Sequence, residues 1–273
     1  MTIDILFCTM NSRIVRLPDL LMEPNTQVRY VISYQYTKDE YLDLIPKTLL
    51  EREDVTLVKI KGQGLSENRN NALKYATSDL VYIADDDVRF LPTMMQTITS
   101  VFETYSEGID IALFQAQTYA GRDLREYRMS EGPCNTFKDL LHVLTIEMVC
   151  RREKIKNMQF DSRFGLGSEH LSCYEQQVWL TDALRQNLKV CYIAQPIVQT
   201  SAIFVPRMIY VDPKVQRSFG ALLYYVYGWR AYGKAFLEAL DTTRRRFAHL
   251  LPVLSRLFEG INYIRNNPKD RIK

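Results

Sequence analysis

Short apolar runs alternate with polar, helix-like stretches along the first half of the chain. The runs are rich in Ile, Val and aromatic residues and are too short for buried helices, so they predict strands. The expected strands are Ile3–Thr9, Val28–Ser33, Val55–Ile60, Leu80–Ala84 and Ile111–Gln117. Strands that alternate with helices in this way favour a mostly parallel sheet with helices on its faces.

Two helices are expected between these strands. Ser66–Thr77 places apolar side chains near one helical face, and Pro92 opens a second helix that runs to about Tyr105. Ser66 is expected to be the N-cap of the first helix, which would make Arg69 its third residue.

The middle of the chain is less regular. The pattern predicts a strand over Val143–Cys150, a long loop over Phe160–Cys173 and a helix over Glu175–Gln186. Two further strands are expected at Val190–Ile193 and Ile197–Phe204. The irregular segment before them, residues 121–138, is polar and is expected to form a loop or hairpin.

The last part of the chain has a helical pattern. It begins at Lys214 and continues almost to the end, with interruptions around Gly228 and Pro252. The simplest division is therefore an α/β domain over residues 1–205 and a C-terminal helical extension over residues 206–273.

Composition and total charge are those of an ordinary globular protein. The 273 residues are 47% hydrophobic and 25% charged, which argues against disorder or a fibre. A formal net charge of only +3 argues against a protein that coats nucleic acid, so no nucleic-acid partner is expected. Eight basic and two acidic residues lie between Thr242 and Lys273, so this tail carries +6 and the rest of the chain −3.

The basic tail has two interpretations. Helical segments such as Phe247–Phe258, beside Arg244–Arg246, can rest on an anionic membrane that carries a lipid-linked acceptor. Alternatively, the helices pack on their own domain and the arginines are solvated.

Cysteine and histidine usage indicates a cytoplasmic protein without a structural zinc site. The five cysteines are scattered singly and read as reduced thiols, and the three histidines are far apart. No run reaches the roughly 18 apolar residues of a membrane span, and the N-terminal residues lack the pattern of a signal peptide. The expected location is cytoplasmic, with peripheral contact at the inner face of the cell membrane if the basic helices bind it.

Three consecutive carboxylates follow the apolar run Leu80–Ala84. Asp85, Asp86 and Asp87 would sit at the carboxyl end of a buried strand, where α/β sheets place their ligands. If the chain stays extended, Asp85 and Asp87 share one side and Asp86 faces the other. A divalent cation such as Mg²⁺ or Mn²⁺, bridging a diphosphate, would remove the repulsion among them. The alternative is a solvated turn before the helix that follows.

Arg69 is the second candidate. A cation in the first turn of a helix opposes the helix dipole unless an anion binds there. One interpretation is therefore contact with a phosphate or a uracil ring, and the other is an arginine that turns to solvent or to a nearby glutamate.

A glycine-containing loop is the third candidate. It delivers Asp161, Glu169 and Glu175 ahead of an amphipathic helix, where one of them can act as a general base in a cleft. Glu175 has a second interpretation, as an acidic residue that stabilises the first turn of that helix.

Four motifs, in this order, resemble those of the family 2 glycosyltransferases with the GT-A fold. They are Ile5–Arg13, Gly64–Leu73, Ile83–Pro92 and Phe160–Gly167, and the resemblance covers about residues 3–203. It implies a mostly parallel GT-A-like central sheet with flanking helices, to which the C-terminal helices are an extension. It also implies an inverting enzyme that moves a sugar from a nucleotide-sugar, a UDP-sugar above all, to a saccharide or lipid-linked acceptor in surface polysaccharide synthesis.

The resemblance implies roles for the residues that match the donor motifs. Asp85 and Asp87 would hold the Mg²⁺ or Mn²⁺ that bridges the donor diphosphate, and Asp86 would lie near the ribose. Arg69 would contact the uracil or the phosphates, and Thr9 would line the base pocket.

The resemblance assigns the general base to Glu175, which would deprotonate an acceptor hydroxyl. The family motif has two adjacent carboxylates, and here Gln176 occupies the second position. If the base belongs at that second position, Glu169 or Asp161 takes the role instead.

Two other positions depart from the family pattern. Gln35 lies at the end of the second strand, where an acidic residue usually reads the nucleobase, and its amide can donate and accept hydrogen bonds to uracil. Gln199 stands near a position where a histidine metal ligand is common. Two other functions therefore stay open: a catalytically silent nucleotide-sugar-binding subunit, and a nucleotidyltransferase that uses the same aspartates and releases pyrophosphate.

Overall fold

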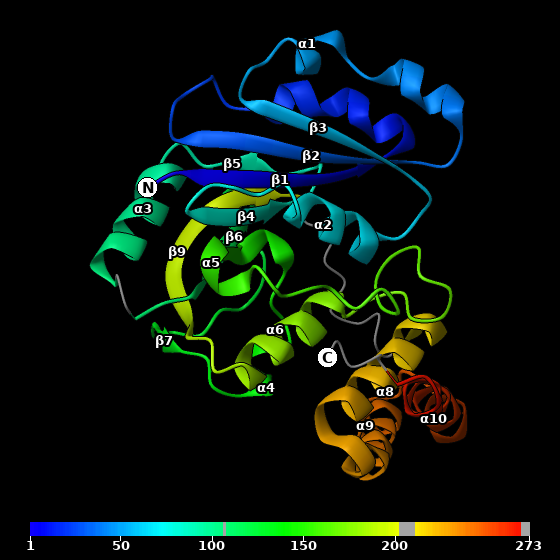
Figure 1. The fold of residues 1–273 in the computed structure, drawn as a ribbon. Helices are drawn as coiled ribbons and strands as arrows, with labels where there is room; N and C mark the ends of the chain where they lie inside the picture. The colour runs from blue at the N-terminus through cyan, green and yellow to red at the C-terminus, as the bar shows by residue number, and fades with distance from the viewer. Residues whose placement is uncertain (106–107, 202–210, 269–273) are drawn as a thin grey trace.

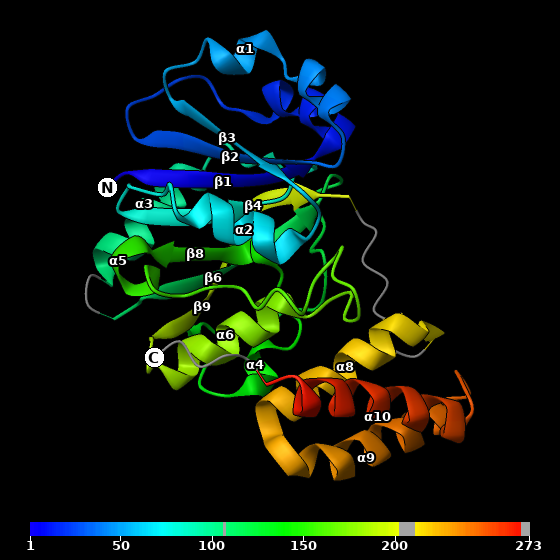
Figure 2. The same cartoon turned by 45° about the vertical axis from the view of Figure 1, so that its right-hand side comes forward.

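The protein is built on one long mixed sheet. The computed structural model describes residues 1–105, 108–201 and 211–268, and within them the strands form a nine-stranded sheet. The strand order is β3-β2-β1-β4-β8-β6-β9-β5, and β7 pairs with β9 (Figures 1 and 2). The strands are β1 (Ile3–Met10), β2 (Val28–Tyr36), β3 (Val55–Lys61), β4 (Leu80–Ala84), β5 (Arg89–Phe90), β6 (Ile111–Thr118), β7 (Gly132–Pro133), β8 (Met148–Arg151) and β9 (Val190–Thr200).

The first four strands run parallel and form the half of the sheet that was expected from the sequence. β1 lies between β2 and β4, with Ile3 opposite both Val28 and Leu80. All five residues of β4 are buried, because a parallel sheet is covered by helices on both faces. The carboxyl ends of β1, β2 and β4 therefore meet at one edge of the sheet.

The second half of the sheet is mixed, and it differs from the sequence prediction at three of the expected strands as well as in the short strands β5 and β7. The strand expected over Val143–Cys150 begins only at Met148, and Thr145–Glu147 forms a 3₁₀ turn before it. The buried Glu147 carboxylate accepts a hydrogen bond from the Leu144 backbone N–H at 2.9 Å, and this bond favours the turn over an extended chain. The two strands expected around Pro196 form one strand, β9, in which a bulge in the pairing with β6 accommodates the proline. The expected end of the second strand, at Phe204, lies outside the described residues.

Helices cover both faces of the sheet. The α-helices are α1 (Lys47–Leu50), α2 (Leu65–Leu73), α3 (Met94–Thr104), α4 (Phe137–Leu140), α5 (Arg152–Ile155), α6 (Glu175–Arg185), α8 (Pro213–Tyr227), α9 (Ala231–Arg244) and α10 (Leu250–Asn266). The 3₁₀ helices are η1 (Asn11–Leu20), η2 (Asp39–Leu44), η3 (Thr145–Glu147) and η4 (Gly228–Arg230).

Alternate residues of each strand point into two separate hydrophobic layers. In β1, Ile5 packs in the layer that holds α3 and η1, whereas Leu6 packs in the layer that holds α2, α5 and α6. α3 thus covers one face of the sheet and α2 and α6 the other (Figures 1 and 2).

The C-terminal helices form a third hydrophobic cluster. Residues from α8, α9 and α10 pack there against Phe164, Leu171 and Val178, so the extension rests on the loop before α6 and on α6 itself. The expected boundary between residues 205 and 206 lies outside the described residues. None of the helices in the described ranges is long and apolar enough to cross a membrane.

The second helix break lies a few residues earlier than expected. It falls at residues 245–249, and Pro252 lies in the first turn of α10. A proline is tolerated there, because the backbone N–H groups of a first turn have no partner within the helix. The first break, around Gly228, is where the sequence predicted it.

Two glycines allow the backbones of α8 and α10 to touch. A Cβ atom at Gly220 would lie less than 3.0 Å from the Leu257 carbonyl oxygen, and one at Gly260 less than 3.0 Å from the Arg217 carbonyl oxygen. Because the obstructing atoms are backbone atoms, a side chain at either position must push the helices apart.

We predict that Gly260→Ala destabilises the protein by about 1–3 kcal/mol or more, because the added methyl group collides with the α8 backbone. Urea unfolding measures the effect. Gly233→Ala in α9 is the matched control, since a Cβ there meets nothing within 4 Å, and it should be neutral or slightly stabilising. Equal stabilities for the two variants would contradict the close approach of α8 and α10.

Candidate functional site

A cavity of about 650 Å³ lies at the edge where the carboxyl ends of β1, β2 and β4 meet. α2 and the first residues of α6 form part of its wall. Six of the candidate site residues from the sequence line it: Gln35, Arg69, Asp85, Asp86, Asp87 and Glu175. Segments more than 100 residues apart in the sequence thus converge on one space.

The three aspartates follow β4 but do not continue it. The strand ends at Ala84 and a turn begins at Asp86, so the expected alternation of an extended chain does not apply. Asp85 is 44% exposed, and its carboxylate lies 3.4 Å from Arg69 Nη2. The buried Asp86 carboxylate accepts a hydrogen bond from Thr9 Oγ1 at 2.8 Å and pairs with the Arg13 guanidinium.

The aspartates repel one another when all are charged. Burial and, next, the carboxylates of Asp85 and Asp86 raise the pKa of Asp87. The pKa of Asp86 is also raised, chiefly by burial and against the opposing effects of Thr9 and Arg13. An ionised Asp87 is therefore less favourable in the folded chain than in the unfolded one.

Arg69 is the buried cation of the site. Its Nη1 donates to Glu175 Oε1 at 2.7 Å, and its Nη2 donates to Thr145 Oγ1 at 2.7 Å and faces Asp85. Burial, the largest influence, lowers the pKa of Arg69, but the carboxylates of Glu175 and Asp85 outweigh it and the net shift is upward. The guanidinium stays charged because these carboxylates replace the water it has lost.

The start of α2 differs from the expectation that placed Arg69 in the first turn. Gly64 precedes the helix with a φ of +134°, and the helix begins at Leu65. Ser66 is not the N-cap, since its hydroxyl donates to the Phe164 carbonyl oxygen at 2.7 Å. Arg69 is thus the fifth residue of the helix, and it turns inward to a glutamate rather than toward the helix N-terminus.

The other polar residues of α2 fix the walls of the cavity. The Asn70 side chain makes two hydrogen bonds to the backbone of Phe160, at 2.7 and 2.8 Å. Asn68 Nδ2 donates to the Thr9 carbonyl oxygen at 3.1 Å, and Asn71 Nδ2 donates to Ser33 Oγ at 2.9 Å. α2 therefore holds the ends of β1 and β2 on one side and the loop around Phe160 on the other.

The glycine-containing loop docks on the start of α2. The Leu65 backbone N–H donates to the Leu166 carbonyl oxygen at 2.8 Å. A Cβ atom at Gly167, where φ is +84°, would lie 3.1 Å from the Gly64 nitrogen, so the two backbones meet where only glycine fits easily.

Among the three candidate bases, Glu175 lines the cavity. Asp161 is buried and bound to Arg163 at 2.5 Å, and Glu169 is 87% exposed beside His170. Neither of them lies among the cavity-lining residues in the described part of the chain. Gln176 does line the cavity, next to Glu175.

Gln35 and Thr9, both expected at the nucleobase, occupy different positions. Gln35 lies near the end of β2, is 2% exposed and lines the cavity, and within the described residues its Nε2 has no hydrogen-bond partner. Thr9 is not among the described residues that line the cavity, but its hydroxyl donates to Asp86, which does line it.

Asp85 and Asp87 are the residues that could hold a metal ion. In the described ranges no group of three His, Cys, Asp or Glu side chains is placed to bind one. Two cavity-lining carboxylates that repel each other still fit Mg²⁺ or Mn²⁺, since such ions commonly bind one or two carboxylates and complete their shell with water and substrate phosphates.

Arg13 and Thr145 are site residues that the sequence did not reveal. Arg13 pairs with Asp86, and Thr145 accepts a hydrogen bond from Arg69. Arg13 lies within the first of the four motifs and could have been considered for this reason, whereas nothing in the sequence around Thr145 marks it.

We predict that Arg69→Met destabilises the protein by about 3–5 kcal/mol, because it leaves the Glu175 carboxylate buried without its cation. Urea unfolding at neutral pH measures the loss. Adding Glu175→Gln to the same chain should restore part of the stability, since it removes the unpaired charge.

The control for this prediction is Lys61→Met, which breaks an ion pair of similar length, 2.9 Å, with Asp39. Both partners are more than half exposed, so little or no loss of stability is expected. A double variant no more stable than Arg69→Met would mean that Arg69 does not act through Glu175.

Comparison with known proteins gives the family and the fold. A model described as glycosyl transferase family 2 matches residues 19–165, more than half of the chain. The crystal structure of S. aureus TarS 1–349 is similar, with a TM-score of 0.63 and 13% identity over 99% of this chain and 93% of that one. The same protein in complex with UDP-GlcNAc has a TM-score of 0.60, again at 13% identity and with the same coverage.

A longer TarS structure matches with a TM-score of 0.54 and 16% identity over 91% of this chain, which spans 44% of that one. No curated protein matches the sequence. The likeness to TarS confirms the expected GT-A fold, with a helical stretch at the C-terminus. The family match confirms the resemblance seen in the four motifs, and the chain belongs to glycosyl transferase family 2.

Proposed function

We propose that the protein is a metal-dependent, inverting glycosyltransferase that uses a nucleotide-sugar, with UDP as the nucleotide. The observation that carries the proposal is the single cavity in which Arg69, Glu175 and the three aspartates meet. Crystal structures of TarS in complex with UDP and with UDP-GlcNAc support the choice of donor.

The donor would lie along the ends of β1, β2 and β4. Gln35, whose buried Nε2 has no hydrogen-bond partner within the described residues, would offer its amide to the uracil ring. Asp86, held by Thr9 and Arg13, would lie near the ribose. Arg69 would contact the uracil or the phosphates from the cavity wall while Glu175 and Asp85 keep it in place.

Asp85 and Asp87 would hold Mg²⁺ or Mn²⁺ against the donor diphosphate. Such an ion neutralises the negative charge that grows on the leaving nucleoside diphosphate. The chain itself contributes the two partly buried carboxylates at the end of β4, where reduced contact with water strengthens their interactions.

Glu175 would take the proton from the acceptor hydroxyl. It is the first residue of α6 and lies in the cavity wall, and the hydrogen bond from Arg69 fixes one carboxylate oxygen. The acceptor oxygen would then attack the anomeric carbon in line with the departing diphosphate, which inverts the configuration.

Two alternative functions can be distinguished by their products. A silent nucleotide-sugar-binding subunit is favoured by Gln176, which stands where the family motif has a second carboxylate, and it would bind UDP without turnover. A nucleotidyltransferase would release pyrophosphate instead of a nucleoside diphosphate.

We propose that residues 1–205 carry out the transfer and that residues 206–273 place the enzyme at the inner face of the cell membrane. The product would be a surface polysaccharide or its lipid-linked precursor, made in the cytoplasm on a saccharide or lipid-linked acceptor. Support for the membrane contact comes mainly from α9, because Val253 and Leu257 of Phe247–Phe258 are buried in the third hydrophobic cluster and that segment adds the exposed Leu251.

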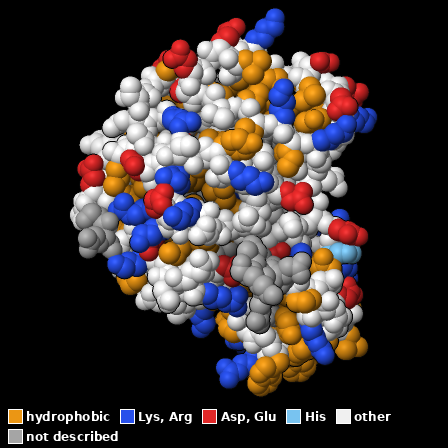
Figure 3. Space-filling view, viewed as in Figure 1, with side chains coloured by type: hydrophobic (Ala, Val, Ile, Leu, Met, Phe, Trp, Pro, Cys, Tyr) orange, Lys and Arg blue, Asp and Glu red, His pale blue; other side chains and the backbone are white. Residues whose placement is uncertain are grey.

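The outward face of α9 and its neighbours is apolar and basic. Large apolar side chains are exposed there by 40–77%: Trp229, Phe236, Leu237, Leu240 and Leu251. Arg230, Lys234 and Arg244 are exposed beside them, whereas Ala231, Ala235 and Ala239 face inward. Figure 3 shows hydrophobic and basic side chains together over the helical extension.

This mixture fits an anionic lipid surface better than a second copy of the chain. A symmetric dimer through the same face would bring these cations together. Exposed tryptophan, leucine and basic side chains on one helix face are typical of interfacial helices, whose apolar side enters the bilayer while the cations meet lipid phosphates.

We predict that Asp87→Asn abolishes metal-dependent hydrolysis of UDP-sugars and sugar transfer. The melting temperature should stay the same or rise, because the substitution removes a carboxylate whose charge is disfavoured in the folded state. Assays of UDP release and thermal unfolding measure the two effects, and Asp43→Asn, at an exposed aspartate outside the cavity, is the control.

Full activity of Asp87→Asn, or of the wild type in excess chelator, would contradict the metal role. Binding of UDP without turnover across a panel of donors would instead identify the silent subunit.

We predict that Leu237→Glu lowers the affinity for vesicles containing anionic lipid by about tenfold or more, since burial of one leucine side chain contributes about 1.5–3 kcal/mol. Co-sedimentation with vesicles measures the change. Leu50→Glu is the matched control, because Leu50 is 63% exposed in α1, at the opposite end of the molecule (Figure 1). Unchanged sedimentation, or a solution dimer that Leu237→Glu abolishes, would contradict the assignment.

A further inference from the structure

A second cavity, of about 220 Å³, has a cationic and aromatic lining. It lies between β6 and β9 on one side and the segment around α4 on the other. Its basic and aromatic lining residues are Arg125, Tyr127, Arg128, Lys138, His142 and Tyr192, and we call this space the cationic cavity.

Stacked rings hold two of the cations in place. The rings of Tyr127 and Tyr192 stack with centroids 6.3 Å apart and an interplanar angle of 17°. The Arg125 guanidinium lies 4.2 Å from the Tyr127 ring centroid, and the Arg128 guanidinium lies 5.3 Å from that of Tyr192. The arginines are therefore positioned without a bound ligand.

The positive charge of the cavity is only partly neutralised. Arg125 is paired with the buried Glu147 at 2.7 Å. Asp139 approaches Arg128 only at 3.9 Å, because its other carboxylate oxygen accepts hydrogen bonds from the start of α4, including one from Thr136 Oγ1 at 2.8 Å. Lys138 has no hydrogen-bond or ion-pair partner within the described residues, so at least one cation faces the cavity uncompensated.

His142 contributes an imidazole whose pKa is affected by the positive charge of the cavity. Burial and then the nearby Arg125 lower its pKa, so the imidazole is neutral at pH 7. A neutral imidazole can still donate one hydrogen bond to an anion.

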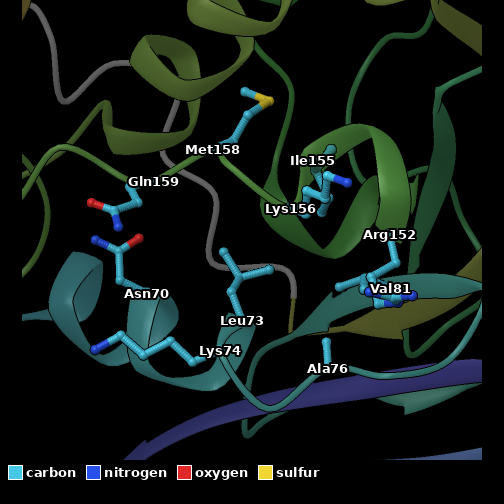
Figure 4. Close-up of a pocket in the computed structure, with 10 residues that line it drawn as sticks. All are labelled: Asn70, Leu73, Lys74, Ala76, Val81, Arg152, Ile155, Lys156, Met158 and Gln159. Atoms are coloured by element: carbon cyan, nitrogen blue, oxygen red, sulfur yellow. The ribbon is translucent and has the colours of Figure 1, made fainter. Parts of the chain in front are cut away.

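A smaller basic hollow elsewhere in the molecule can be compared with the cationic cavity. It holds only about 70 Å³, and Figure 4 shows Lys74, Arg152 and Lys156 around it. Two of its cations are already paired with Glu153, Arg152 at 2.7 Å and Lys156 at 3.2 Å. The cationic cavity is larger, and its lining includes two tyrosines whereas the described lining of the smaller hollow has no aromatic residue, so it offers an anion-bearing ligand more contacts.

We propose that the cationic cavity binds an oxyanion, the phosphoryl or carboxylate group of a small ligand or of a saccharide. Arg128 and Lys138 would make the charge-assisted hydrogen bonds, which are the strongest that a phosphoryl group accepts. The tyrosine pair supplies an aromatic wall for the part of the ligand that carries the anion. The inference rests on the cavity alone and does not require the proposed donor chemistry.

The cationic cavity shares a wall with the donor cavity. His142 and Val143 line the smaller space, and the next two residues, Leu144 and Thr145, line the larger one. Glu147 connects the two, since its carboxylate accepts hydrogen bonds from Leu144 N at 2.9 Å and from Tyr127 OH at 2.6 Å, besides its pair with Arg125. An oxyanion bound here would thus lie beside the place where the sugar is transferred.

Isothermal titration calorimetry of the full chain with inorganic phosphate tests the proposal, with and without saturating UDP. We expect saturable phosphate binding that UDP does not displace and that Lys138→Met weakens by about fivefold or more. Arg128→Gln should do the same, and Lys156→Met, in the smaller hollow, should have no effect.

Lys138 is exposed and unpartnered in the described chain, so its substitution leaves the fold intact, which a melting curve checks. Titrations with glucose 6-phosphate, phosphate and glucose distinguish a phosphoryl group carried by a sugar from a free anion. If glucose 6-phosphate binds more tightly than phosphate, the cavity takes a sugar-borne group, and if the two bind equally, it takes the free anion. Phosphate binding that is absent, displaced by UDP, or unchanged in Lys138→Met would overturn the proposal. UDP binding is titrated separately. An absence of UDP binding would therefore count against the proposed function and not against the cationic cavity.

Discussion

The buried ion pair between Arg69 and Glu175 is the interaction on which the site depends. A guanidinium that is 3% exposed can stay charged only with carboxylates beside it, and here Glu175 and Asp85 supply them. These three residues come from α2, α6 and the end of β4, so the pair fixes how those elements meet. Breaking one partner would leave an uncompensated charge in the wall of the cavity.

The remaining polar residues of α2 extend this constraint to the whole site. Asn68 and Asn71 bind the strands that end at the cavity, and Asn70 and Ser66 bind the loop before α6. The same helix therefore holds the proposed donor side, at the sheet edge, and the proposed base, Glu175, in one arrangement. Arg13 and Arg69 neutralise only part of the charge of the aspartates after β4, and a bound cation would neutralise the rest.

The sequence predicted the elements whose signal is local. The parallel strands, β4 before the aspartates, and the helices on either side follow from short apolar runs and their spacing, and the structure confirms them. The sequence prediction failed where residues far apart in the chain determine the local structure. Ser66 resembles an N-cap in the sequence, but in the structure its hydroxyl donates to the Phe164 carbonyl oxygen. The strand expected from Val143 is replaced at its start by a turn that Glu147 stabilises. The partner of Arg69 lies 106 positions away, beyond any sequence pattern.

The most direct test of the account is a crystal structure of the protein with UDP and Mn²⁺. The account predicts the nucleotide in the large cavity, with its base near Gln35 and its diphosphate joined through the metal to Asp85 and Asp87, while Arg69 still pairs with Glu175. A nucleotide bound elsewhere, or a metal ion that does not contact these aspartates, would contradict it.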